Sequence, residues 1–452
     1  MSARDVAGIG LVGFGNIGRE VYSYFRTGRD GARVVAIARR RPRSAAPAAV
    51  RRLLARSAGE LVANPRVDVV VELTGDADGG ARLMLEAIAA GKHVVTGNKE
   101  ALAKHWPALV GAARERGVTL GFEATVGGGM PVVRTMQRHI SGDEVEHFAG
   151  ILNGTCNYIL ARMQEYIVAN LDHPAIQRLA LPMEEALAQA QALGFAEPDP
   201  TNDIAGFDTR YKVAILANLA FDTFVDPAAI PCEGIWEPRQ RIMPSDLYFL
   251  HHPRYLNGKF ALKLVGVAER RAGPPALRVH PALIDRAGPL ADLAGIDETY
   301  NGIVVRSRRL GTQFLKGLGA GPAPTTVSIA ADVREIAASI ASGAQARGRA
   351  GGPRARPAAL GDVRSVPTRG YIRSFSPDVR GIYAKKLEVL ARHRVNVQSV
   401  VNVREFVYGR DRLMPDYIEV DETPDGAVGR VLDDFRRMRD VRDPMYFRVL
   451  EL

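Results

Sequence analysis

The stretch around residues 9–38 contains the feature that most constrains the fold, a glycine-rich turn between an apolar run and a helical pattern. Residues 9–12 are apolar, and residues 13–18 read GFGNIG, which has the spacing G-x-G-x-x-G. Residues 20–26 then follow a helical pattern, and residues 34–38 read as a second strand. This order within about 30 residues is typical of a dinucleotide-binding βαβ unit. The sequence therefore predicts a doubly wound α/β domain here.

Each glycine of this turn has a physical task. Gly13 permits the tight turn, Gly15 lets the backbone approach a pyrophosphate, and Gly18 allows close packing of the helix. The amino end of the helix also attracts phosphate groups. The residues of the turn expected to bind the cofactor are Gly13, Phe14, Gly15, Asn16, Ile17 and Gly18.

The residues after the second strand indicate which dinucleotide is bound. Residues 38–41 read ARRR, without the acidic residue that binds a ribose 2′-hydroxyl in NAD enzymes. Arginine instead suits a 2′-phosphate. We therefore expect NADP(H), with Arg39 or Arg40 as the contact, while NAD(H) remains possible. The alternative is a solvated basic loop.

Two further strands end in polar residues. Residues 67–73 read as a strand that leads into Thr74, and residues 93–96 as a strand that leads to Lys99. Ligands of open α/β sheets lie at the carboxyl ends of strands, so we expect both residues near the cofactor, with Lys99 also near the substrate. An ordinary surface lysine is the alternative for Lys99.

Residues 193–216 combine an acidic run with a single lysine. Asp199 precedes a proline, which predicts an N-cap and one helix that continues to about Leu219. Asp208 and Lys212 are four residues apart and share a helical face. Lysine is an effective acid or base when its neighbours tune it. A surface helix with one ion pair is the alternative.

Residues 193–212, LGFAEPDPTNDIAGFDTRYK, resemble the substrate-binding signature of homoserine dehydrogenases, L-G-[YF]-[AT]-E-x-D-P-x-x-D-[VIL]-x-G-x-D-x-x-x-K, at every fixed position. The resemblance implies interconversion of L-aspartate 4-semialdehyde and L-homoserine by hydride transfer, in the threonine and methionine branch of biosynthesis. It implies that Lys212 is the proton donor and that Asp208 orients it. It also implies that Glu197 binds the substrate ammonium, that Asp203 contributes to the substrate site, and that Lys99 positions substrate and cofactor.

Two other segments are similar to the same family. Residues 123–131, EATVGGGMP, resemble its interdomain hinge, which also holds a monovalent cation, usually sodium. The ligands implied by that resemblance are Glu123, Val126, Gly128 and Met130, and a hinge without an ion is the alternative. Residues 317–326 resemble the segment whose following helix covers the cofactor, which implies that Gly321 lies in the cofactor site.

The last part of the chain predicts a separate small module. Residues 342–367 are rich in Gly, Ala, Pro and Arg and read as a flexible linker. Residues 370–452 follow a β-α-β-β-α-β order, which is ferredoxin-like. The module resembles an ACT domain, an amino-acid sensor, although its Asp378–Gly381 turn lacks the family's proline. The resemblance implies a threonine effector, and a structural or oligomerising role is the alternative.

The expected architecture is therefore α/β, with three domains in a homodimer or tetramer. Residues 1–127 and about 319–341 form a Rossmann NADP-binding domain, residues 128–318 an α+β substrate-binding and dimerisation domain, and residues 368–452 a ferredoxin-like, ACT-like domain. Two alternatives to the homoserine dehydrogenase remain: an amino-acid-sensing binding protein, and another nicotinamide-dependent dehydrogenase on the same scaffold.

Composition excludes several other classes. The two cysteines, Cys156 and Cys232, argue against a disulfide framework and a cysteine-based zinc site. No apolar run reaches about 18 residues, so we expect a cytoplasmic protein without a membrane partner. The net charge of +10 comes mainly from scattered arginines, and no nucleic-acid-binding motif accompanies it. We therefore expect no nucleic-acid partner.

Overall fold

The computed structural model describes residues 6–28, 31–39, 48–237, 240–270, 273–343, 359–410 and 412–452. The chain forms two compact units. The first consists of Met1–Glu146, Tyr211–Ala229 and Arg306–Ala359, and the second of His147–Arg210, Ile230–Val305 and Leu360–Leu452. Each unit is thus assembled from three stretches that are separated in the sequence.

The first unit is built on a five-stranded parallel sheet. Its strands are β1 Ala7–Val12, β2 Ala32–Ala38, β3 Val69–Glu72, β4 His93–Thr96 and β5 Leu120–Gly121, in the order β2-β1-β3-β4-β5. All of β1 is buried, as expected for a strand covered on both faces. Strands β2 and β3 lie on opposite sides of β1, so the strand order changes direction at β1. Sheets of this kind bind dinucleotides at the carboxyl ends of the strands beside such a change.

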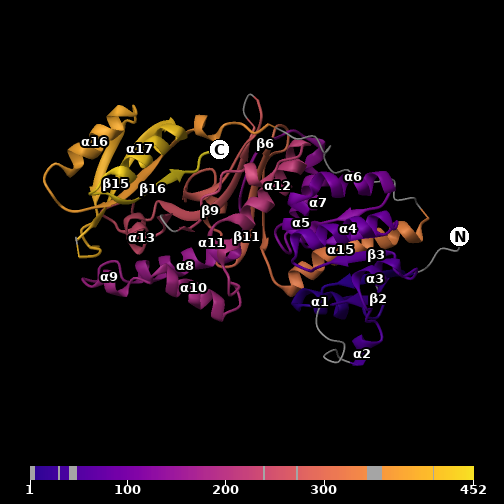
Figure 1. Cartoon of the computed structure of the whole chain (residues 1–452). Helices are drawn as coiled ribbons and strands as arrows, with labels where there is room; N and C mark the ends of the chain where they lie inside the picture. The colour runs from indigo at the N-terminus through magenta and orange to yellow at the C-terminus, as the bar shows by residue number, and fades with distance from the viewer. Residues whose placement is uncertain are drawn as a thin grey trace. The chain divides into compact units, whose positions relative to one another are not determined.

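Helices cover this sheet, and one of them comes from much later in the chain. The helices of the first unit are α1 Asn16–Phe25, α2 Ala48–Arg51, α3 Ala58–Ala63, α4 Ala77–Ala89, α5 Lys99–Lys104, α6 Trp106–Arg116, α7 Val132–Arg138 and α15 Pro322–Ala341, and strand β12 Gly311–Leu318 precedes α15. Ile329, Val333 and Ile336 of α15 join Val21 and Phe25 of α1 in one buried apolar cluster. In Figure 1 the late helix α15 therefore lies among the earliest elements.

The second unit is built on a large mixed sheet. Its strands are β6 Val145–Ile151, β9 Phe260–Glu269, β10 Ala276–Asp285, β11 Tyr300–Ser307, β13 Pro367–Ser376, β14 Val397–Asn402, β15 Met414–Pro424 and β16 Arg442–Val449. They follow one another in the order β11-β6-β9-β10-β16-β13-β15-β14. A short hairpin, β7 Trp236–Glu237 with β8 Gln240–Arg241, is separate. The helices are α8 Gly154–Ala169, α9 Ile176–Leu179, α10 Met183–Ala192, α11 Thr201–Ile204, α13 Pro244–His251, α14 Ala291–Ala294, α16 Ile382–Arg392 and α17 Asp425–Arg437.

The C-terminal module has the predicted β-α-β-β-α-β order, β13-α16-β14-β15-α17-β16. Its four strands pair antiparallel in the order β16-β13-β15-β14, so the predicted ferredoxin-like topology is confirmed. Its strand β16 also pairs parallel with β10, where Ala282 lies opposite Arg448 and Leu283 opposite Val449. The module thus continues the sheet of the second unit. The ACT assignment itself stays a prediction.

One predicted element is wrong. The single helix expected from Asp199 to about Leu219 is two helices, α11 and α12 Phe207–Phe221, with a turn at Gly206 between them. Gly206 has φ +81°, in the left-handed region that glycine adopts without strain. Asp199 still helps to start α11, because its carboxylate accepts hydrogen bonds from the N–H and the hydroxyl of Thr201.

The predicted linker falls largely outside the described part of the chain. Residues 344–358 of the expected stretch 342–367 are not among the described residues, and neither is Arg40. Among the residues that are described, no helix is both long and apolar enough to cross a membrane.

Candidate functional site

The glycine-rich turn has the geometry that dinucleotide binding requires. Gly13 has φ +99°, and a Cβ there would lie 2.4 Å from the carbonyl oxygen of Leu73. A Cβ on Gly18 would lie 2.3 Å from the carbonyl oxygen of Gly13, so only glycine allows this close packing of α1. Gly15, the N-cap of α1, has open space around its Cβ position. The amino end of α1 is therefore accessible to a phosphate group.

Arg39 directly follows β2 and lies close to this turn. Its guanidinium carbon is 6.0 Å from the centroid of the Phe14 ring, within the range of a cation–π contact. This contact holds a positive charge beside the glycine-rich turn. Arg40, the other residue expected to contact a 2′-phosphate, lies outside the described residues.

The loops after β3 and β4 are joined by a buried carboxylate, Glu72. Thr74 donates from its N–H and its hydroxyl to Glu72 Oε1, at 2.8 and 2.6 Å. The Thr96 hydroxyl donates to Glu72 Oε2 at 2.8 Å, and Asn98 accepts from the N–H of Ala101 and so caps α5. This network fixes the two loops at the carboxyl end of the sheet, where Thr74 and Lys99 lie. The sequence analysis missed Glu72, although an acid that ends an apolar strand was a visible signal.

The segments that carry Lys99 and Lys212 are in direct contact within the first unit. Lys99 is the first residue of α5, and the next residue, Glu100, accepts a hydrogen bond from the Tyr211 hydroxyl at 3.1 Å. Lys104 donates to the same carboxylate at 2.6 Å. Tyr211 immediately precedes Lys212, whose side chain is 8% exposed. The two lysines predicted at the site therefore come from neighbouring pieces of chain.

The predicted acidic residues of the second unit are held by Asn153. Its Nδ2 donates to Asp203 Oδ1 at 2.7 Å and to Asp208 Oδ2 at 2.9 Å, and its Oδ1 accepts from the N–H of Cys156 at the start of α8. Glu197 is exposed, and its carbonyl accepts a hydrogen bond from Gln191. Asp203 and Asp208 thus form one cluster, whereas the Glu197 side chain faces solvent.

The predicted cation hinge contains a buried carboxylate with a free oxygen. Glu123 is 4% exposed, and its Oε2 accepts from the N–H of Arg134 at 2.6 Å. Its Oε1 is buried and has no hydrogen-bond partner among the described residues. Burial, together with the nearby charge of Asp332, raises the pKa of Glu123 to about 7. A cation beside Oε1 is one way to satisfy this oxygen.

The other expected cation ligands of the hinge follow Glu123 in the sequence and are buried. They are Val126, Gly128 and Met130. The hydroxyl of Ser328, on α15, donates to the carbonyl oxygen of Gly128 at 2.5 Å. Gly321, expected in the cofactor site, is the N-cap of α15 with φ +114°. No group of three or more His, Cys, Asp or Glu residues in the described chain has a metal-binding arrangement. That finding does not bear on the expected hinge site, because most of its ligands would be backbone carbonyl oxygens.

Comparison with known proteins identifies the family. Residues 131–333 match the family model described as homoserine dehydrogenase, and residues 13–123 match the model described as homoserine dehydrogenase, NAD binding domain. The homoserine dehydrogenase of Pseudomonas aeruginosa is 32% identical over 404 residues, covering 88% of this chain and 87% of that protein.

The chain belongs to the homoserine dehydrogenase family.

Other relatives agree. The homoserine dehydrogenase of a Synechocystis strain is 31% identical over 404 residues, covering 86% of this chain and 85% of that protein. A crystal structure of a homoserine dehydrogenase from Thiobacillus denitrificans superposes with a TM-score of 0.82 at 28% identity, covering 98% of both chains. The predicted family, fold class and activity are confirmed.

The activity follows from membership of the homoserine dehydrogenase family. The protein is an NAD(P)-dependent oxidoreductase that interconverts L-aspartate 4-semialdehyde and L-homoserine, in amino-acid biosynthesis. Matches to both the nucleotide-binding and the catalytic part favour this enzyme over a sensor protein and over another dehydrogenase.

Asn153 is the main residue that the sequence analysis did not assign to the site. It belongs to the segment NGTCNY, and in the structure it is the N-cap of α8. Its second role, bridging two carboxylates, depends on residues 50 and 55 positions later in the chain. No local pattern carries that information.

Proposed function

We propose that this member of the homoserine dehydrogenase family uses NADP(H) in preference to NAD(H). The observation that carries the proposal is Arg39, held beside Phe14 of the glycine-rich turn at the end of β2. NAD enzymes of this fold have an acidic residue near this position, whereas residues 38–41 read ARRR. A guanidinium group suits the doubly charged 2′-phosphate of NADP(H).

Initial rates of homoserine oxidation by the wild-type enzyme with NADP⁺ and with NAD⁺ test this preference. We expect kcat/KM to be at least about tenfold higher with NADP⁺, because a charge-assisted contact to the 2′-phosphate contributes about 1.5–3 kcal/mol. Equal values, or a higher value with NAD⁺, contradict the NADP(H) proposal and leave the family assignment intact.

The substrate chemistry is assigned to residues on and around α12. When bound, the nicotinamide exchanges a hydride with the terminal carbon of the substrate. Lys212 donates the proton that the carbonyl oxygen of the semialdehyde needs, and it accepts that proton when homoserine is oxidised. Asp208 precedes Lys212 by one helical turn and orients it. The low exposure of Lys212 supports this role, because water competes less at a buried amine.

The remaining polar residues bind the substrate. Glu197 pairs with the substrate ammonium, and Asp203, fixed by Asn153, accepts hydrogen bonds from the same end of the molecule. Lys99, at the amino end of α5, positions substrate and cofactor. The contact between Glu100 and Tyr211 supports this arrangement, because it fixes the segment of Lys99 next to that of Lys212.

We also propose that the hinge binds a monovalent cation such as sodium. Glu123 supplies the carboxylate, and the carbonyl oxygens of Val126, Gly128 and Met130 complete the oxygen ligands that a hard cation prefers. The buried Oε1 atom of Glu123, which has no partner in the described chain, supports this proposal. Such an ion stabilises the loop between β5 and α7 and takes no part in the reaction.

The effect of sodium on thermal stability, measured without any activity assay, tests the cation site. Replacing choline chloride by sodium chloride at equal ionic strength is expected to raise the Tm of the wild type by about 2–5 °C, because a ligand that binds only the folded state stabilises it. Glu123→Gln should abolish the rise. Glu184→Gln, which alters a surface carboxylate paired with Arg241, is the matched control and should keep it. A rise that survives in Glu123→Gln contradicts the site.

The partners expected from the resemblance belong to the same proposal. They are a threonine effector at the C-terminal module and a second copy of the chain, in a cytoplasmic homodimer or tetramer. The ferredoxin-like topology of the module supports the effector. Thermal shift with threonine and light scattering of the purified enzyme test the two partners.

A further inference from the structure

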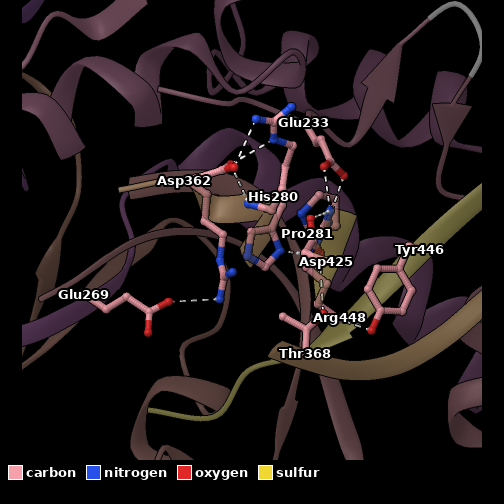
Figure 2. A network of polar contacts seen from close by, with 11 residues as sticks. Glu233, Glu269, His280, Pro281, Asp362, Thr368, Asp425, Tyr446 and Arg448 are labelled. Atoms are coloured by element: carbon pink, nitrogen blue, oxygen red, sulfur yellow. Dashed lines mark hydrogen bonds and ion pairs between the residues drawn. The ribbon is translucent and has the colours of Figure 1, made fainter. Parts of the chain in front are cut away.

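Arg448, on β16, is the centre of a polar network that joins three distant segments of the second unit (Figure 2). Its Nη1 and Nη2 donate to the two carboxylate oxygens of Glu233, at 3.0 and 2.8 Å. Its Nε donates to Asp425 Oδ1, at the start of α17, at 2.6 Å. The Arg448 side chain is 8% exposed and that of Glu233 35%. The bidentate ion pair of the guanidinium thus links Glu233 to the C-terminal module.

Glu233 belongs to a short segment that packs on the junction of α11 and α12. The N–H of Ile235 donates to the carbonyl oxygen of Ile204 at 2.8 Å, and Cys232 Sγ donates to that of Ala205 at 3.2 Å. A Cβ on Gly234 would lie only 2.2 Å from the Ile204 carbonyl oxygen, so the two backbones touch. The position of this segment therefore determines the position of the junction.

The junction carries a proposed substrate carboxylate. Asp203 is the residue directly before Ile204, and Asn153 holds its side chain at 2.7 Å. Cys156 Sγ also donates to the Asp203 carbonyl, at 3.2 Å. A series of direct contacts thus runs from Arg448 through the Glu233 segment to the backbone of Ile204, the residue that follows Asp203.

We propose that Glu233 is a positioning residue for Asp203, and that its ion pair with Arg448 couples the C-terminal module to homoserine binding. The inference rests on the proposed substrate role of Asp203. The backbone of the Glu233 segment is also held to β10, where the N–H of Glu233 donates to the Val279 carbonyl oxygen at 2.8 Å. Loss of the ion pair leaves that attachment but frees the side chain from the module, so the junction samples other positions more often and the substrate carboxylate is less often aligned. A cavity of about 970 Å³, which Glu233, Asp425 and Arg448 help to line, lies beside the ion pair and leaves room for the Glu233 side chain to move once the pair is lost.

The first test is Glu233→Gln, which keeps the shape of the side chain and removes its charge. We expect KM for homoserine to rise about three- to tenfold, the range typical of residues that act on a site through contacts. Because Lys212 and the glycine-rich turn are unchanged, kcat and KM for NADP⁺ should change less than about twofold. Arg448→Lys, which keeps the charge but loses the bidentate ion pair, should raise KM for homoserine in the same way.

Glu405→Gln is the matched control. Glu405 also links the C-terminal module to the rest of the unit, since it accepts from the Tyr255 hydroxyl at 3.0 Å, and its side chain is 25% exposed. Among the described residues, no hydrogen bond joins Glu405 to the Glu233 segment. We expect its KM for homoserine to match the wild type. Equal rises in Glu405→Gln and Glu233→Gln overturn the inference, because any loosening of the module then has the same effect.

Asp203→Asn separates this inference from the proposed function. If Asp203→Asn leaves KM for homoserine unchanged, the substrate role of Asp203 fails and the route through it fails as well. If it raises KM while Glu233→Gln does not, only the positioning role of Glu233 is overturned. In the double variant, Glu233→Gln should add no further rise to that of Asp203→Asn, because both changes act on one carboxylate. If the two rises in KM add in the double variant, Glu233 does not act through Asp203.

Discussion

Replacing Lys212 by methionine is expected to lower kcat for homoserine oxidation by about 10²- to 10⁴-fold, the usual contribution of a positioned acid or base. Methionine fills a similar volume and cannot accept the proton of the substrate hydroxyl. The glycine-rich turn is unchanged, so NADP⁺ binding, measured by fluorescence titration, should stay within about twofold of the wild type. Steady-state rates and cofactor titration of the same preparation are the measurement.

Two variants decide whether the lysine transfers a proton or supplies only a charge. Lys212→Arg keeps the charge, but arginine stays protonated at neutral pH, so we expect a loss of kcat close to that of Lys212→Met. Lys104→Met is the control, because Lys104 lies beside Tyr211 and pairs with Glu100 without a proposed role in the reaction. Near-wild-type kcat in Lys212→Arg would assign Lys212 an electrostatic role.

Arg39→Ala is expected to raise KM for NADP⁺ about 10- to 100-fold, because it removes a charge-assisted contact of about 1.5–3 kcal/mol to the 2′-phosphate. KM for NAD⁺ should be nearly unchanged, because NAD⁺ has an uncharged hydroxyl in place of the phosphate at this position. The preference for NADP⁺ therefore falls, and initial rates with both cofactors measure it.

Arg33→Ala is the matched control for Arg39. Arg33 lies on the same strand, β2, near its amino end, and its guanidinium donates to the carbonyl of Thr27. A comparable loss of NADP⁺ affinity in Arg33→Ala would show a general effect of net charge. If Arg39→Ala leaves both KM values unchanged, the 2′-phosphate contact lies elsewhere.

Much of this fold is predictable from sequence because its signals are local. The glycine-rich turn needs residues without a Cβ at Gly13 and Gly18, and the close distances at both positions explain why the pattern is specific. The β-α-β-β-α-β order of the C-terminal module likewise follows from alternating short patterns that lie next to one another in the chain.

The features that the sequence analysis missed depend on contacts between distant residues. Gly206 breaks the expected long helix because its turn packs against Cys232, and helical spacing alone does not reveal this neighbour. The acid that ends β3, Glu72, was visible in the sequence, but its role in joining two loops depends on Thr96, which is 24 residues later in the chain. The short parallel pairing of β16 with β10 is also absent from the sequence analysis, because parallel strands far apart in sequence leave no local signal.

The interleaving of the two units has a consequence for synthesis on the ribosome. The last strand of the Rossmann sheet ends at Gly121, but α15, which covers α1 and the sheet, begins at Pro322. At about 5–20 residues per second, roughly 10 to 40 seconds separate the two events. During that interval the nascent chain carries an uncovered apolar face, which is the kind of surface that chaperones bind. Chain order thus sets how long this face stays uncovered during synthesis.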